Sequence, residues 1–127
     1  MYGKSLTFAG RPEEAIPMFQ RAIRLNPSGI GTTGLYLNLG IALRVTGRFE
    51  EAVSAFKKAI QRAPDNIMAH IGLVVTYSLM GREKDARTAA AEVLRINPKF
   101  SAEYFVNNAV PKDQDIVLNA LRKAGLK

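Results

Sequence analysis

Apolar and small residues recur along the chain in a pattern that appears three times. Each copy has a glycine turn, an acidic segment with an alanine, two further apolar or small positions and a proline. The copies begin at Gly10-Arg11-Pro12-Glu13-Glu14-Ala15, Gly47-Arg48-Phe49-Glu50-Glu51-Ala52 and Gly81-Arg82-Glu83-Lys84-Asp85-Ala86. The downstream positions are Phe19, Ala22 and Pro27, then Phe56, Ala59 and Pro64, then Ala90, Val93 and Pro98. The copies begin 37 and 34 residues apart, and a repeat of this length predicts stacked helical units instead of one closed core.

The prolines give the period of the pattern. Pro64 and Pro98 are 34 residues apart, whereas Pro27 and Pro64 are 37 apart. The difference predicts a three-residue insertion between Ser28 and Thr33. The glycines at positions 29, 31 and 34 lack the spacing of a phosphate-binding loop, so we expect them to lie in a flexible inserted loop.

The same pattern predicts where helices begin and end. Helices are expected at 1–9, 12–25, 33–46, 49–62, 67–80 and 83–96. Each of Gly10, Gly47 and Gly81 follows a helical stretch and can adopt the positive φ of a C-terminal cap. The three prolines then end the second helix of each pair, because proline lacks the backbone N–H that a helix needs.

Beyond Pro98 the pattern decays, and two further helices are expected. Ser101 can cap a short helix that carries residues 102–105 and ends near Pro111. A last helix from Asp113 to Ala124 has apolar residues at helical spacing, with Gly125 as its stop. One apolar face is therefore available to cover the last unit of the array, and a detachable partner-binding helix is the alternative.

The middle copy resembles the tetratricopeptide-repeat family. The residues that carry the resemblance are Tyr36, Leu39, Gly40, Leu43, Gly47, Phe49, Ala52, Phe56, Ala59 and Pro64. The third copy is weaker, with Val74 at the first-helix glycine position and Ala90 at the second-helix aromatic position. The first copy begins part-way through its first helix. The resemblance implies an all-α, right-handed solenoid of antiparallel helix pairs with repeats at 1–31, 33–64 and 67–98, and capping helices at 99–127.

In this family the first helices of successive repeats line a concave groove that receives a peptide or a helix. Transferring the groove positions residue by residue gives a mostly aliphatic lining, which favours a helix or an apolar peptide as the ligand. The candidate groove residues are Lys4, Phe8, Leu37, Asn38, Ile41, Arg44, Val45, Ile71, Gly72, Val75, Ser78 and Leu79. The alternative is that these side chains only contact one another or the capping segment.

Two more specific sites are not expected. Family members that hold the tail of a heat-shock protein use a clamp of Lys, Asn and Arg residues, and only Asn38 matches that clamp here. His70 is the single histidine and cysteine is absent, so we expect no catalytic site, metal or cofactor. We expect His70 to be a packing residue.

Charge changes this picture little. The net charge of +7 would suit an acidic partner or nucleic acid. However, basic residues fall near predicted helix ends and acidic residues near helix starts, as the helix dipole favours. Nucleic-acid binding is therefore an alternative and not the main expectation. No apolar stretch is long enough to cross a membrane.

We therefore expect a non-catalytic scaffold for protein partners in the cytoplasm. A short second resemblance points to a larger bacterial polypeptide. The segments Phe100-Ser101-Ala102-Glu103, Lys112-Asp113 and Leu121-Arg122-Lys123-Ala124-Gly125-Leu126 look like the tail of repeat regions in class III adenylate or guanylate cyclases and in some winged-helix regulators. A further alternative is a homodimer formed through the truncated first repeat, where Leu6 and Phe8 would be bared.

Overall fold

The computed structural model describes residues 12–109 and 114–126, and its regular secondary structure is entirely α-helical. The helices are α2 (Pro12–Leu25), α3 (Thr32–Val45), α4 (Phe49–Arg62), α5 (Ile67–Leu79), α6 (Glu83–Ile96), α7 (Ala102–Ala109) and α8 (Gln114–Lys123). The predicted helix at 1–9 lies outside the described residues. The other predicted helices are confirmed, with ends that agree to within one residue for α2 to α6.

Glycines end three of the helices as the sequence predicted. Gly47, Gly81 and Gly125 have φ of 83°, 78° and 101°. After Gly47 the chain turns back, so that the Arg48 N–H donates to the Leu43 carbonyl at 2.8 Å. The same bond closes the turn after Gly81 at 2.9 Å, from the N–H of residue 82 to the carbonyl of residue 77. This pattern satisfies carbonyls that the helix end would otherwise leave unpaired, and it reverses the chain direction within three residues.

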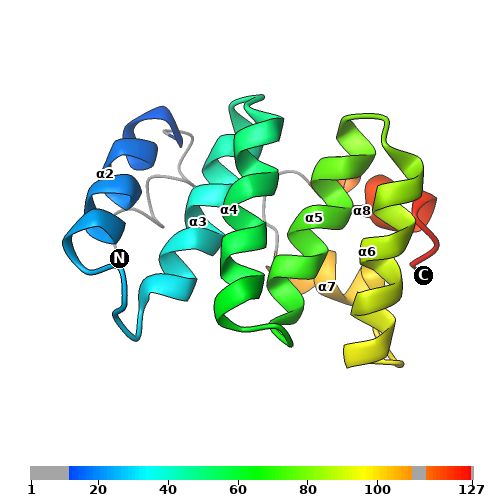
Figure 1. Cartoon of the computed structure of the whole chain (residues 1–127). Coiled ribbons are helices and arrows are strands. Elements are labelled where there is room, and N and C mark those ends of the chain that lie inside the picture. Colours follow the sequence, from blue (N-terminus) through cyan, green and yellow to red (C-terminus); the bar gives the residue numbers. More distant parts are fainter. Residues whose placement is uncertain (1–11, 110–113, 127) are drawn as a thin grey trace.

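The helices stack side by side in two layers (Figure 1). Each helix from α2 to α5 packs against the next one in the chain, and α3 also contacts α5. We call α2, α4 and α6, the second helices of the repeats, the outer helices, and α3 and α5, the first helices, the inner helices. The outer helices carry acidic residues in the first turn and a basic residue in the last turn. The inner helices α3 and α5 have no acidic residue in the first turn and are largely apolar. Within α2 to α6 the charge pattern of the sequence therefore belongs to the outer layer, and α8 has the same pattern with Asp115 in its first turn and Arg122 and Lys123 in its last.

Phe56 of α4 is the side chain that packs between two helix pairs, α3 with α4 and α5 with α6. It is 1% exposed. A Cβ built at Gly40 of α3 would lie 2.7 Å from the Phe56 ring, and one built at Gly72 of α5 would lie 2.4 Å from it. The ring is therefore held between two glycines on neighbouring inner helices. Gly72 provides the close approach in α5, whereas Val74, which stands at the family's glycine position, is fully buried in the core.

Arg62, the last residue of α4, holds the linker between α2 and α3. Its guanidinium donates to the carbonyls of Pro27 and Gly29 at 2.9 and 3.0 Å. The hydroxyl of Thr32 donates to the Asn26 carbonyl at 2.7 Å. The expectation that all three glycines of this stretch lie in a loop was wrong for Gly34, which is part of α3.

The last two helices depart from the stacking order. Ser101 caps α7 as predicted, because its Oγ accepts from the Tyr104 N–H at 3.2 Å. Helix α8 packs against α7 and, more extensively, against α5. Figure 1 shows α7 and α8 behind α5 and α6. The last predicted helix therefore covers an inner helix of the array, which is what a capping helix does.

Candidate partner-binding face

The predicted groove residues of α3 lie on a face that is only partly covered. Leu37, Asn38, Ile41 and Arg44 are half-buried, and Val45 is 43% exposed. We call these five residues the α3 inner face. Leu37, Ile41 and Val45 are four residues apart, so their side chains follow one another along one side of the helix.

The corresponding residues of α5 are placed differently. Ile71 and Val75 lie 34 positions after Leu37 and Ile41, and each is only 3% exposed. Ser78 is half-buried, and its Oγ donates to the backbone carbonyl of Ala120 in α8 at 3.2 Å. The structure thus brings the two predicted halves of the groove onto helices that contact each other, and α8 packs against α5 with the Ser78–Ala120 hydrogen bond between them. Of the other predicted residues, Gly72 is half-buried next to the Phe56 ring, and Leu79 is 39% exposed. Lys4 and Phe8 lie outside the described residues.

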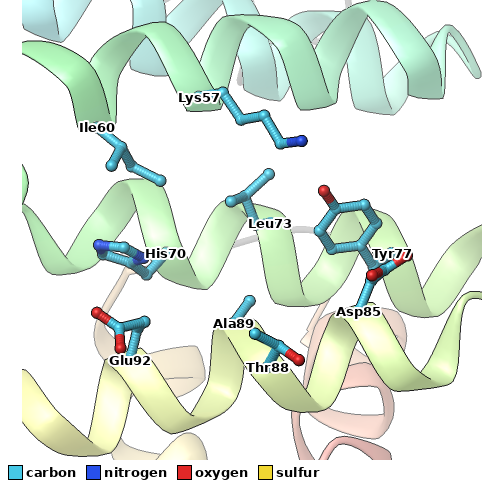
Figure 2. Close-up of a pocket in the computed structure, with 9 residues that line it drawn as sticks. All are labelled: Lys57, Ile60, His70, Leu73, Tyr77, Asp85, Thr88, Ala89 and Glu92. Atoms are coloured by element: carbon cyan, nitrogen blue, oxygen red, sulfur yellow. The ribbon is translucent and has the colours of Figure 1, made fainter.

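A cavity of about 270 Å³ lies between α4, α5 and α6 and contains none of the predicted groove residues (Figure 2). It is lined by Lys57 and Ile60 of α4, by His70, Leu73 and Tyr77 of α5, and by Asp85, Thr88, Ala89 and Glu92 of α6. Sequence reasoning missed this cavity because its lining comes from three helices with no shared motif.

His70 lies in the wall of that cavity and has a structural partner. It is 6% exposed, and its Nε2 is 2.9 Å from the Pro64 carbonyl. Because a carbonyl only accepts, Nε2 carries the proton in this bond. This agrees with its prediction as a packing residue. Its neighbour Tyr77 has the Arg82 guanidinium over its ring, 4.8 Å from the centroid.

The charged side chains form several exposed ion pairs. Arg82 pairs with Asp85 at 2.7 Å, and Arg48 pairs with Glu51 at 2.6 Å. Hydrogen bonds to Asp65 and then to Glu92 raise the pKa of Arg95 above its ordinary value. Such exposed pairs contribute little to stability because water and salt screen them.

Further basic residues are spread over several helices. They include Arg21 and Arg24 of α2, Arg44 of α3, Lys57 and Lys58 of α4, and Lys84 and Arg87 of α6. Helices α2, α4 and α6 also carry acidic residues in the first turn. Among the described residues no three His, Asp or Glu side chains come together as a metal site, and no helix there is long and apolar enough to span a membrane.

Comparison with known families decides what this helical array is. Two models described as tetratricopeptide repeat match residues 3–67 and 43–105. The chain belongs to the tetratricopeptide-repeat family. It is an all-α solenoid of antiparallel helix pairs with a C-terminal capping helix. No curated protein sequence matches it.

Solved structures with the same fold include tetratricopeptide-repeat proteins of several kinds. The structure of PilW, a type IV pilus biogenesis factor, matches 97% of this chain with a TM-score of 0.76 and 22% identity. MamA matches 96% with a TM-score of 0.73 and 23% identity, and a thermophilic protein of Thermus thermophilus matches 97% with a TM-score of 0.68 and 20% identity. The chain spans 55% of the PilW chain, 71% of MamA and 69% of the Thermus protein. At these identities the likeness concerns the fold.

Proposed function

We propose that this tetratricopeptide-repeat protein is a non-catalytic interaction module that binds a partner helix or apolar peptide on the α3 inner face. The observation that supports the proposal is the seating of α8 on α5. Leu37 and Ile41, which are half-buried on α3, correspond to Ile71 and Val75 on α5, which are buried, and an amphipathic helix of the chain itself packs against α5. The first helix of one repeat, α5, therefore already packs against an additional helix, α8.

The chemistry of the α3 inner face favours an apolar ligand with a few polar contacts. Leu37, Ile41 and Val45 present aliphatic side chains, while Asn38 can both donate and accept hydrogen bonds. Arg44 adds one positive charge. Amphipathic helices bind such faces through apolar anchors three or four residues apart, and the polar residues then fix their orientation.

The wider context of the module is also a proposal. The division into repeats at 1–31, 33–64 and 67–98 with a cap at 99–127 is consistent with the helix ends, and we keep it. We further propose a cytoplasmic protein that forms part of a larger bacterial polypeptide, such as a class III cyclase or a winged-helix regulator. The absence of cysteine suits a reducing compartment.

The two alternative functions have less support from the described residues. Homodimerisation was predicted from Leu6 and Phe8, which lie outside them. Nucleic-acid binding was predicted from the net charge, and the structure distributes the basic residues over α2, α3, α4, α6 and α8, with acidic residues in the first turns of all of these except α3. A protein or peptide partner therefore remains the proposal.

Affinity measurements on inner-face variants test this function. Peptide ligands are first selected from a displayed library of helical and extended peptides against the wild-type protein. Their affinities are then measured by fluorescence anisotropy for wild type, Val45→Asp and Ile41→Asp. A desolvated carboxylate in an apolar contact is costly, so we expect each variant to lose about tenfold or more in affinity. Circular dichroism checks that both variants remain helical.

Leu94→Asp is the matched control. Leu94 is an apolar residue on the outer helix α6 with 39% exposure, close to the 43% of Val45. It should leave ligand affinity unchanged. Ligands that bind Val45→Asp and Ile41→Asp as tightly as wild type would place the binding surface elsewhere on the molecule.

A further inference from the structure

Two pairs of corresponding positions in α3 and α5 differ in burial. Ile71 and Val75 of α5 are buried, whereas Leu37 and Ile41 of α3 are half-buried. All four residues are aliphatic, so the difference does not come from the residue types. Helix α8 packs against α5 and is hydrogen-bonded to Ser78 of the same face, and we attribute the difference to it.

Helix α8 packs against α5 and α7 and buries a narrow stripe of small and aliphatic side chains. Val117, Ala120, Leu121 and Ala124 are all buried, and they lie at the positions i, i+3, i+4 and i+7 of one helix face. Asn119 and Arg122, on the other side of the helix, are exposed. This is the pattern of a helix that binds in a groove through a few anchors.

The two helices approach closely at Ala120. Its carbonyl accepts from the Ser78 Oγ of α5 at 3.2 Å and also from the Ala124 N–H of its own helix at 3.2 Å. A hydroxyl on α5 reaches the α8 backbone because alanine at this position adds little bulk. A helix with a large side chain there would lose this contact, so the seat is selective for a small residue.

Besides the apolar stripe, the Ser78 hydrogen bond and the fully buried side chain of Leu126 hold this segment, and its charged contacts are weak. Its two ion pairs, Lys123 with Glu83 at 3.7 Å and Arg122 with Glu103 at 3.6 Å, are formed by exposed side chains. Exposed pairs of this kind are weak. Helix α8 has ten residues, which is too short for a stable isolated helix in water, so its helicity depends on the seat.

We propose that α8 is an intramolecular ligand of the α5 inner face, by which we mean Ile71, Val75 and Ser78, and that a partner helix with the same stripe binds there by displacing it. The expected partner is an amphipathic helix with valine or leucine anchors around a central alanine and with basic residues toward its C-terminal end. Glu83 and Glu103 are placed to meet those basic residues. This proposal rests on the proposed function, since it assumes that inner faces of this array bind helices, and it adds the second half of the binding surface.

A peptide with the sequence of residues 114–126 is the probe for this proposal. It is labelled with a fluorophore and titrated with three full-length proteins, namely wild type, Leu121→Asp and Ile116→Asp. Leu121 is fully buried in the seat, whereas Ile116 lies on the same helix and is 50% exposed. Leu121→Asp should unseat α8 and leave α5 free, while Ile116→Asp is the matched control for an added charge on α8.

We expect the peptide to bind Leu121→Asp at least about tenfold more tightly than wild type or Ile116→Asp. A site that is closed most of the time binds its ligand more weakly in proportion to the open fraction. Adding Val75→Asp to the Leu121→Asp protein should abolish binding, which assigns the site to α5. A peptide that itself carries the Leu121→Asp change should not bind. Should Leu121→Asp lose helicity beyond α8, Leu121→Ala replaces it, since it removes the anchor without adding a charge.

Two results would overturn the proposal. One is equal affinity of the peptide for wild type and for the unseated variants, which would mean that α8 does not compete for the site. The other is no binding to variants that remain folded, which would make α8 a permanent cap. Both results are independent of the library ligands and their dependence on Val45, so failure of this proposal is distinguishable from failure of the proposed function.

Discussion

Gly72 offers the sharpest test of how the two helix pairs are joined. A methyl group at this position would lie 2.4, 2.5 and 2.7 Å from three carbon atoms of the Phe56 ring. Carbon atoms in contact are normally about 3.5–4.0 Å apart, so the ring would have to move by roughly 1 Å. It cannot move freely, because Gly40 also lies close to the ring, with Cε1 and Cζ near both glycines, and the side chain is buried.

The expected cost follows from these contacts. Overpacking of a well-packed core costs about 1–3 kcal/mol, and a ring held from two sides belongs toward the upper end. Replacing glycine by alanine within a helix returns up to about 1 kcal/mol of helix propensity. We therefore expect Gly72→Ala to lower the free energy of unfolding by about 2 kcal/mol. At this chain length that corresponds to roughly 4–10 °C in Tm.

Urea and thermal unfolding followed by circular dichroism provide the measurement, and the chain offers a matched control. Gly34 is also a helical glycine, but a Cβ there would meet nothing within 4 Å. Gly34→Ala should therefore stabilise the protein by about 0.5 kcal/mol. The opposite signs of the two glycine-to-alanine changes separate packing from propensity.

A second substitution tests the assigned cause. Phe56→Leu removes ring atoms that meet the new methyl group, so the double variant Phe56→Leu/Gly72→Ala should lose less stability than the two single changes added together. Strict additivity would show that the ring is not what Gly72 accommodates. A Gly72→Ala protein as stable as wild type would refute the reasoning altogether.

Three further predictions concern turns, the first linker and charge. Gly81→Ala should cost about 1 kcal/mol in urea unfolding because Gly81 has a φ of 78°, whereas Gly31→Ala, at a position without positive φ or nearby atoms, should be close to neutral. Arg62→Gln should release the linker between α2 and α3 and speed its cleavage in limited proteolysis, because Arg62 donates to two of its carbonyls, while Arg87→Gln on α6 should cleave as wild type does. Raising NaCl from about 0.05 to about 0.5 M should change the free energy of unfolding by less than about 1 kcal/mol, since the ion pairs are exposed, and a larger loss would show that they matter more than their exposure indicates.

The sequence alone determined the helices and their ends. Gly47 and Gly81 cap α3 and α5, and Pro64 and Pro98 follow the ends of α4 and α6. The alternation of charged outer helices and apolar inner helices can also be read along the chain. These signals are local, because a cap, a proline or a helical stripe acts on residues within one or two turns of itself. The family resemblance and the all-α solenoid followed from the same repeated spacing.

Only the tertiary structure decided which inner face stays open. The sequence placed Ile41 and Val75 in one groove, and it predicted that the apolar face of the last helix covers the last repeat without saying which helix of that repeat it contacts. The choice of α5 depends on the fit of a stripe centred on Ala120 and Leu121 to a surface about 40 residues earlier in the chain. The role of Gly72 was hidden for the same reason, since its partner Phe56 belongs to another helix pair. Contacts between distant segments depend on shape and packing, which no short stretch of sequence contains.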